Sequence, residues 1–164
     1  MPTVMYAIGH STRTLDDFIA LLEAHAITML VDIRTIPKSR HNPQFNSDSL
    51  QAGLESRGIA YVHMKELGGL RKPQKDSVNA GWRNASFRGY ADYMQTRAFV
   101  SAVRRLMQLG RRQRVAIMCA EGNPLRCHRS LVADALTVRK VRVLHISGKT
   151  TARAHTLTRF AHVD

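Results

Sequence analysis

The sequence contains few cysteines, few aromatic residues and no long apolar run, and each shortage excludes a class of protein. Two Cys occur among 164 residues, too few for a small secreted scaffold held together by disulfides. Aromatic residues make up 6% of the chain, which argues against an extensive platform for stacking single-stranded nucleic acid. No apolar run approaches the roughly 20 residues that cross a bilayer, and the N-terminus lacks the order of a secretory signal. We therefore expect a cytoplasmic protein with reduced thiols and no membrane partner.

Acidic residues are also few. The chain has 12 Asp and Glu against 25 Lys and Arg, which gives a net charge of +13. The excess is concentrated after Arg97, where Glu121, Asp134 and Asp164 are the only acids. Such a field attracts polyanions such as nucleic acid, although it also serves solubility without any partner. The hydrophobic content of 44% is ordinary for a globular protein, and the length fits one domain over residues 1–164.

Apolar runs rich in β-branched residues alternate with helical patterns along the chain. The runs are continuous, which is typical of strands covered on both faces in a parallel sheet. The sequence therefore predicts an α/β fold, a single three-layer domain with a mostly parallel central sheet of about five strands and helices on both faces. The expected strands are Val4–Ile8, Met29–Ile33, Ile59–His63, Val115–Cys119 and Val141–Ile146.

The helix signals are caps and stop residues. The first helix is expected after a cap at Thr14, the second at Ser47–Arg57 before Gly58, the third at Thr96–Leu109 before Gly110, and the fourth from Asn123-Pro124. Residues 66–93 interrupt the alternation with a long polar segment. Compact domains seldom contain such a stretch without a use for it, so this segment is expected to form a lid or flap.

Polar side chains follow every expected strand. In an open parallel sheet, ligands bind at the carboxyl ends of the strands, so these groups are expected to line one shared site. A single His or Asp after a strand is usually structural, but five such endings at one edge favour a functional site. The groups are Gly9-His10-Ser11, Asp32 with Arg34, His63, Cys119 with Glu121, and His145 with Ser147.

Several ordered motifs resemble a known family. They are Gly9-His10-Ser11, Val31–Arg34 with Pro37, Ser39 and Arg40, Leu67–Gly69, Phe87–Tyr90, Met118–Glu121, Cys127–Ser130, and His145-Ile146 with Gly148 and His155. Along nearly its whole length the chain resembles the domain-of-unknown-function family numbered 488, DUF488. The resemblance implies a compact α/β domain in bacterial or archaeal cytoplasm, and it brings no settled activity or cofactor.

The stretch from Met118 to Ser130 gathers the most reactive side chains. Cys119 is expected where a strand meets a loop, and Cys127 in the first turn of the next helix, where the helix dipole favours a thiolate. We predict Cys119, Glu121, Cys127 and His10 as catalytic residues, with Glu121 moving protons and His10 orienting or shuttling. The alternative for Cys119 is a small buried core residue.

Guanidinium groups near these cysteines favour an anionic ligand such as a phosphate. Asp32 and Arg34 have an alternative structural use, which is to pair with each other. The predicted ligand-binding residues are Ser11, Asp32, Arg34, Arg40, Arg126, His128 and Arg129.

Two other functions remain open at this point. The basic C-terminal half could make the chain a non-catalytic nucleic-acid-binding module. The third hypothesis is a metal-dependent enzyme whose ligands come from different strand ends. The gap between the two cysteines is too long for a zinc knuckle. The ligands of the metal-dependent enzyme would be Cys119, Cys127, His128, His10 and His145. The sequence defines neither a cofactor nor an oligomeric state.

Overall fold

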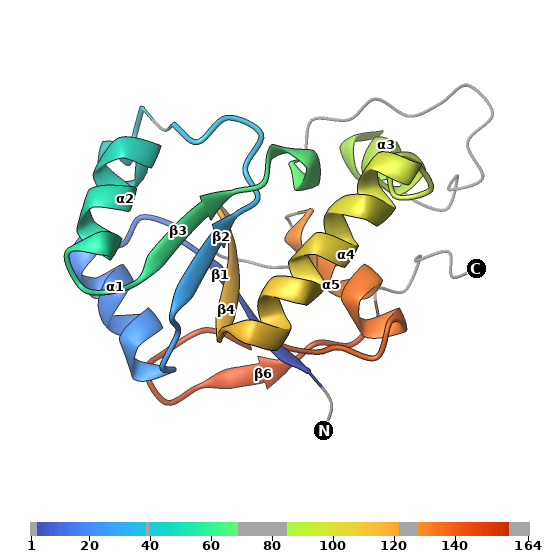
Figure 1. Ribbon diagram of the computed structural model, residues 1–164. Helices are drawn as coiled ribbons and strands as arrows, with labels where there is room; N and C mark the ends of the chain where they lie inside the picture. The colour runs from blue at the N-terminus through green and yellow to red at the C-terminus, as the bar shows by residue number, and fades with distance from the viewer. Residues whose placement is uncertain (1–2, 39, 69–84, 122–127, 158–164) are drawn as a thin grey trace.

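The structure is a computed structural model that describes residues 3–38, 40–68, 85–121 and 128–157. A sheet runs through its centre (Figure 1). It has six strands in the order β3-β2-β4-β1-β5-β6. The first five strands are parallel and β6 is antiparallel to β5. The strands are β1 Val4–Gly9, β2 Met29–Asp32, β3 Ala60–His63, β4 Val115–Cys119, β5 Arg142–Ile146 and β6 Ala152–Ala154. The predicted α/β class and the mostly parallel sheet are confirmed.

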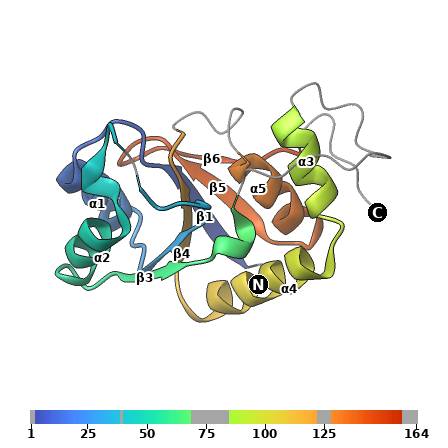
Figure 2. The ribbon, with the colours of Figure 1, turned by 90° about the horizontal axis from the view of Figure 1, so that it is seen from above.

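Helices cover both faces of the sheet, as Figure 2 shows from above. The helices α1, Leu15–Ala24, and α2, Ser47–Glu55, pack on one face. The helices α3, Ala85–Tyr93, α4, Arg97–Arg112, and α5, Arg129–Val138, pack on the other. Two short 3₁₀ helices, η1 at Pro43–Phe45 and η2 at Lys65–Leu67, complete the described elements.

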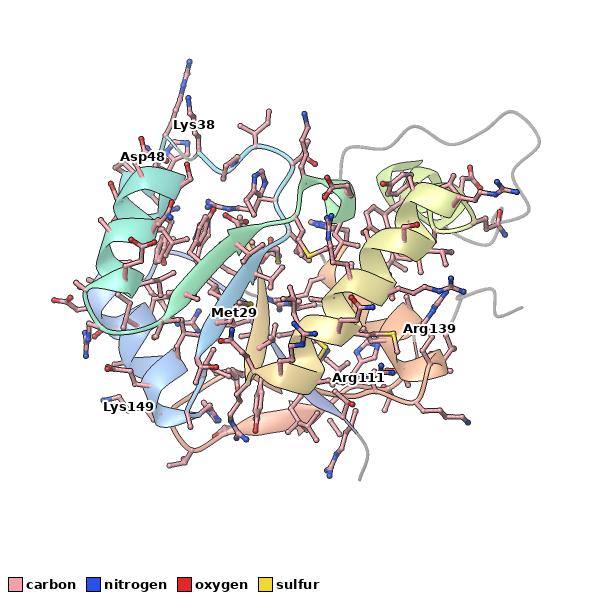
Figure 3. The ribbon with its side chains drawn as sticks, viewed as in Figure 1. Met29, Lys38, Asp48, Arg111, Arg139 and Lys149 are labelled. Atoms are coloured by element: carbon pink, nitrogen blue, oxygen red, sulfur yellow. The ribbon has the colours of Figure 1, made fainter. Side chains whose placement is uncertain are left out.

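The core consists of two apolar layers, one on each side of the sheet. β2 and β4 are buried along their whole length, because helices cover them above and below. Figure 3 shows the buried Met29 of β2 near the middle of the molecule, while the charged Lys38, Asp48 and Lys149 lie at its outside. This burial explains why the strand sequences read as continuous apolar runs.

Two of the predicted helix starts are confirmed by their caps. The Thr14 side chain accepts a hydrogen bond from the backbone of Asp17, and Thr96 accepts one from Phe99. The end of α4 differs from the prediction, because the helix continues through Gly110 to Arg112. A Cβ at Gly110 would lie 2.8 Å from Sδ of Met5. This glycine therefore lets α4 pack against β1, and it does not stop the helix.

Other differences lie at the ends of elements. The sequence did not predict β6, which has three residues and no apolar pattern. α3 forms the last nine residues of the predicted lid and buries Tyr90 in the core. Residues 69–84 lie outside the described residues, so the lid remains a prediction. Within the described part of the chain, every helix is too short or too polar to cross a membrane.

Candidate functional site

The centre of the sheet contains a topological switch point. From β1 the chain passes through α1 to β2 on one side, whereas from β4 it passes through α5 to β5 on the other. β1 and β4 are neighbours, with Gly9 opposite Cys119. Ligands in open α/β sheets bind beyond the carboxyl ends of such strands. The loops after β1 and β4 are therefore the expected place for a site.

The two loops run together beyond the strand ends. The backbone N–H of His10 donates to the carbonyl of Cys119 over 2.9 Å, and that of Ser11 donates to Ala120 over 2.9 Å. Ser11 has a φ of 52°, a left-handed conformation that non-glycine residues adopt rarely and that turns the chain sharply here. The sequence prediction that His10 and Cys119 share one edge of the sheet agrees with this geometry.

His10 lies on the α1/α2 face of the sheet and is 2% exposed. Its ring stacks on Phe45 with 4.3 Å between centroids. Nδ1 lies 2.7 Å from the carbonyl of Ser11 and so donates its proton there. Nε2 is then the unprotonated nitrogen, and it is buried with no hydrogen-bond partner among the described residues.

Asp32 and Arg34 form a buried ion pair beside His10. Nε of Arg34 donates to Oδ1 of Asp32 over 2.9 Å, and Nη2 donates to Oδ2 over 2.7 Å. The backbone of Arg34 and the hydroxyl of Tyr61 also donate to this carboxylate. Asp32 thus accepts four hydrogen bonds, and three of them hold Arg34 in place. This pairing is the structural alternative that the sequence left open. Within the described residues, Nη1 of Arg34 has no partner.

Burial and nearby positive charges both favour the neutral form of the His10 ring. Burial lowers the pKa of His10, and the nearby charges of Arg34 and Arg13 act in the same direction. Arg13 lies four residues beyond Gly9 and donates to the Gly9 carbonyl. Burial lowers the pKa of Arg13 too, and the charge of Arg129 adds to the effect. At the switch point, the charges of Arg34 and Arg13 thus act on His10, and the charge of Arg129 acts on Arg13.

The opposite face of the sheet carries Cys119 and Arg129. Sγ of Cys119 contacts the carbonyl oxygen of Glu121 at 3.5 Å, and Nη1 of Arg129 donates to the same oxygen over 3.3 Å. Gly9 lies beneath them, because a Cβ there would collide with that carbonyl and lie 2.7 Å from Nη1 of Arg129. Cys119 is 1% exposed and Arg129 2%. The glycine thus allows the guanidinium to cross over β1.

Next to Arg129, three further side chains form a hydrogen-bonded chain. Nε2 of His145, on β5, lies 2.7 Å from Nδ1 of His155, and Nε2 of His155 lies 2.7 Å from Oδ1 of Asp134, on α5. Burial lowers the pKa of His145 to about 4, and the charges of His155 and Arg129 contribute. Nδ1 of His145 is buried and lacks a partner among the described residues.

The comparisons with known proteins give a family and no function. The family model for the domain of unknown function DUF488 matches residues 14–136, which is most of the chain. The chain belongs to the DUF488 family. No curated protein and no solved structure was found to match it. The function of this DUF488 chain must therefore be inferred from its own residues.

The predicted site residues of the DUF488 chain divide between the two faces of the sheet. His10, Asp32 and Arg34 lie on the α1/α2 face, whereas Cys119 and Arg129 lie on the α5 face. Ser11 is half-buried between the two loops, and Glu121 and Arg40 are exposed. His128 donates through Nε2 to the carbonyl of Ile33 over 2.9 Å, which ties the start of α5 to the end of β2.

Two predicted residues, Arg126 and Cys127, lie outside the described residues. As described, α5 begins at Arg129, so the prediction for Cys127 stays untested. In the described ranges no three His, Cys, Asp or Glu side chains are placed to hold an ion. Cys127, one ligand of the metal hypothesis, lies outside these ranges, so that hypothesis stays a prediction.

Sequence reasoning missed Arg13, and it missed that Asp134 and His155 join His145, which it had named as a strand-end residue and a possible metal ligand. Arg13 resembled the many other basic residues of this sequence. Asp134 did carry a signal, because it is one of three acids after Arg97 and interrupts an apolar helix. A lone carboxylate in such a helix usually has a buried partner.

Proposed function

We propose that this protein is a small cytoplasmic α/β enzyme that binds a phosphate-bearing or other anionic ligand at the carboxyl edge of its sheet. The observation that carries the proposal is the group of four positive or neutral-basic side chains at the switch point, His10, Arg13, Arg34 and Arg129. They come from three separate segments, and each lies within electrostatic reach of another member of the group.

Charge argues for an anion at this place. Like charges held near one another repel, and the buried carboxylate of Asp32 already accepts four hydrogen bonds, from Arg34 and Tyr61. A bound oxyanion would reduce this repulsion and accept from guanidinium donors such as Nη1 of Arg34. The N-terminus of α5 adds positive potential at Arg129.

Cys119 is the proposed nucleophile of this site, with Glu121 as a proton carrier. The thiol donates to a carbonyl oxygen, which is the contact of an uncharged thiol. Arg129 contacts the same oxygen, so its charge favours the thiolate once that hydrogen bond is broken. Glu121 is exposed two residues after β4, which suits proton exchange with water.

Calorimetry with inorganic phosphate tests the binding step. Wild type is expected to bind phosphate, and Arg13→Gln is expected to weaken binding about tenfold, the value of one charge-assisted hydrogen bond. Arg57→Gln is the matched control, because Arg57 pairs with Glu23 on the surface near the end of α2. Equal affinity for phosphate in all three proteins would contradict the proposed site.

Alkylation tests the cysteine. In a Cys127→Ser background, bound phosphate is expected to slow the reaction of Cys119 with iodoacetamide, since the anion would cover the loop after β4. An unchanged rate at saturating phosphate would remove Cys119 from the site.

A second candidate function is nucleic-acid binding through α4. This helix carries five arginines, and their spacing places all of them on one exposed side: Arg97, Arg104, Arg105, Arg111 and Arg112. Figure 3 shows Arg111 beside the C-terminal end of the helix. Glu66 pairs with Arg105 at 3.1 Å. A stripe of this length could contact successive phosphates of a duplex.

Salt titration separates the two functions. Duplex binding through α4 is expected to weaken steeply with salt, to be lost in the double variant Arg104→Glu, Arg111→Glu, and to be unaffected by Arg13→Gln. Phosphate binding at the switch point is expected to be weakened by Arg13→Gln and to be unaffected by the double variant Arg104→Glu, Arg111→Glu.

A further inference from the structure

The chain of Asp134, His155 and His145 connects the core to the edge of the sheet. Asp134 is 3% exposed on α5, His155 follows β6, and His145 lies on β5. Three elements that are separate in the sequence thus supply one continuous line of hydrogen bonds, each 2.7 Å long. The free end of that line is Nδ1 of His145, which is buried without a partner among the described residues.

The hydrogen-bond rules fix the protons along this line. A carboxylate only accepts, so Nε2 of His155 must carry the proton that it shares with Asp134. When His155 is neutral, its Nδ1 has a lone pair and accepts from Nε2 of His145. His145 then has no proton left for Nδ1. The free end of the line is therefore a proton acceptor.

The same rules describe what happens when a proton arrives. A proton taken up at Nδ1 of His145 allows the proton on its Nε2 to move to Nδ1 of His155. The positive charge then lies on His155, 2.7 Å from the Asp134 carboxylate. His145 itself becomes neutral again, now with a proton on Nδ1.

This transfer avoids an unfavourable charge. Burial and the neighbouring Arg129 both disfavour an imidazolium on His145. On His155 the charge has a carboxylate partner instead. Among the described residues, Arg153 is the exposed cross-strand neighbour of His145 on β6, and Cys119 lies on the same face two strands away.

We propose that His145, His155 and Asp134 form a proton relay that accepts a proton from the anionic ligand or from a water beside it. The proposal rests on the proposed function, since Arg129 lies next to His145 and belongs to the anion site. His145 is the residue that receives the proton, and His155 and Asp134 are positioning residues. The ligand class that fits is an oxyanion with an O–H, such as dihydrogen phosphate or the monoanion of a phosphate monoester, whose second proton is lost near pH 6.

The proton balance of the step is simple. The O–H bond of the ligand or water breaks, its proton moves to Nδ1 of His145, and the proton on Nε2 of His145 moves to Nδ1 of His155. The oxygen keeps the electron pair and becomes the stronger nucleophile or the more strongly bound anion. The reverse transfer returns the proton to a leaving oxygen.

Nitrogen NMR of the histidine rings tests the relay without a ligand. In wild type at pH 8, we expect His145 to carry its proton on Nε2. On acidification, the proton is expected to appear on Nδ1 of His145 in the same transition that protonates both nitrogens of His155. In Asp134→Asn this transition is expected to move down by about one pH unit or more, because the cation loses its carboxylate. His25, which donates to the Gly148 carbonyl, is the internal control.

His155→Gln provides a second variant if Asp134→Asn does not fold. In that protein His145 is expected to titrate as a single ring, without the exchange of protons between its nitrogens. The relay is overturned if Nδ1 of His145 stays bare while His155 becomes protonated, or if Asp134→Asn leaves the titration unchanged.

Phosphate and sulfate distinguish failure of the relay from failure of the anion site. At pH 6 phosphate retains an O–H and sulfate has none, so His145→Gln is expected to weaken phosphate binding about tenfold and to leave sulfate unaffected. If neither anion binds wild type while the NMR transition occurs, the proposed function fails and the proton transfer stands. If both anions bind wild type and His145→Gln changes the two affinities equally or not at all, the ligand is not the source of the proton.

Discussion

His10 and His145 lie on opposite faces of the sheet, one on either side of the end of β1. Both rings have one nitrogen engaged in a hydrogen bond and one buried nitrogen without a partner in the described part of the chain. A backbone carbonyl fixes the tautomer of His10, and carbonyls do not titrate. His155 and Asp134 fix the tautomer of His145, and both of these are titratable groups.

The bare nitrogen of His10 is therefore a hydrogen-bond acceptor whose tautomer is fixed, whereas the tautomer of His145 can change. The His10 region is held by permanent partners, with Phe45 stacked on the ring and the Asp32–Arg34 ion pair beside it. The His145 region depends on the protonation of its neighbours. A site that must both bind an anion and move a proton has a use for each kind.

Asp32→Ala, which removes one partner of the ion pair beside His10, is expected to have the largest effect on stability. Removing one partner of a buried, hydrogen-bonded ion pair leaves Arg34 with an uncompensated charge, so we expect a loss of about 3–5 kcal/mol in the free energy of unfolding. Urea denaturation measures it. Glu66→Ala removes an exposed partner of Arg105 and should cost under about 1 kcal/mol. Similar losses in the two variants would contradict the structural role of Asp32.

Gly9→Ala is expected to disturb both regions at once. A Cβ at this position would collide with the Glu121 carbonyl and press on Arg129. We expect a loss of about 3 kcal/mol in unfolding free energy, measured by the same denaturation. In Gly148→Ala the nearest atom, Oγ1 of Thr151, lies at 3.7 Å, so that control should be close to neutral. A tolerated alanine at position 9 would mean that the loops after β1 and β4 are farther apart.

The pH dependence of stability is expected to come from the His145 region. The folded pKa of His145 is about 4, below the ordinary value of 6.5. Between these values the unfolded chain binds more protons, so stability is full above pH 6.5 and falls as the pH is lowered toward 4. Allowing for the partial exposure of the ring, we expect about 2 kcal/mol of this loss to be absent in His145→Gln.

Thermal unfolding of wild type and His145→Gln at several pH values measures that difference. His63→Gln is the control, because His63 donates to the carbonyl of Arg34 away from the relay. Parallel pH profiles for wild type and His145→Gln would contradict the low pKa.

Tyr61→Phe is expected to have the smallest effect. The hydroxyl of Tyr61 donates to Asp32, and burial together with this hydrogen bond raises its pKa well above 10. Its removal takes one of four hydrogen bonds from the carboxylate, so we expect a loss of about 1 kcal/mol in denaturant titration. The phosphate affinity should not change, since Arg34 remains paired. A loss of phosphate binding would place Tyr61 in the anion site.

Much of the fold could be predicted because its signals are local. Each of the five predicted strands appears within one residue of its expected bounds, and the caps at Thr14 and Thr96 begin their helices. The prediction failed where a residue acts through a distant contact. Gly110 looked like a helix stop, whereas its lack of a Cβ serves the packing of Met5.

Part of the candidate site could be predicted by the same local reasoning. Polar residues after apolar runs identified His10, Asp32 and Cys119, because strand ends are visible in the sequence. Arg13 and His155 were missed because their importance depends on the partners that reach them.

The sequence alone determined the alternation of strands and helices, the strongly basic charge and the edge at which polar groups gather, because periodicity and strand ends follow from the order of neighbouring residues. Only the tertiary structure decided which groups share a face. It joined Asp32 to Arg34, and Asp134 through His155 to His145, since a pairing between distant segments depends on strand order and on the space left by Gly9.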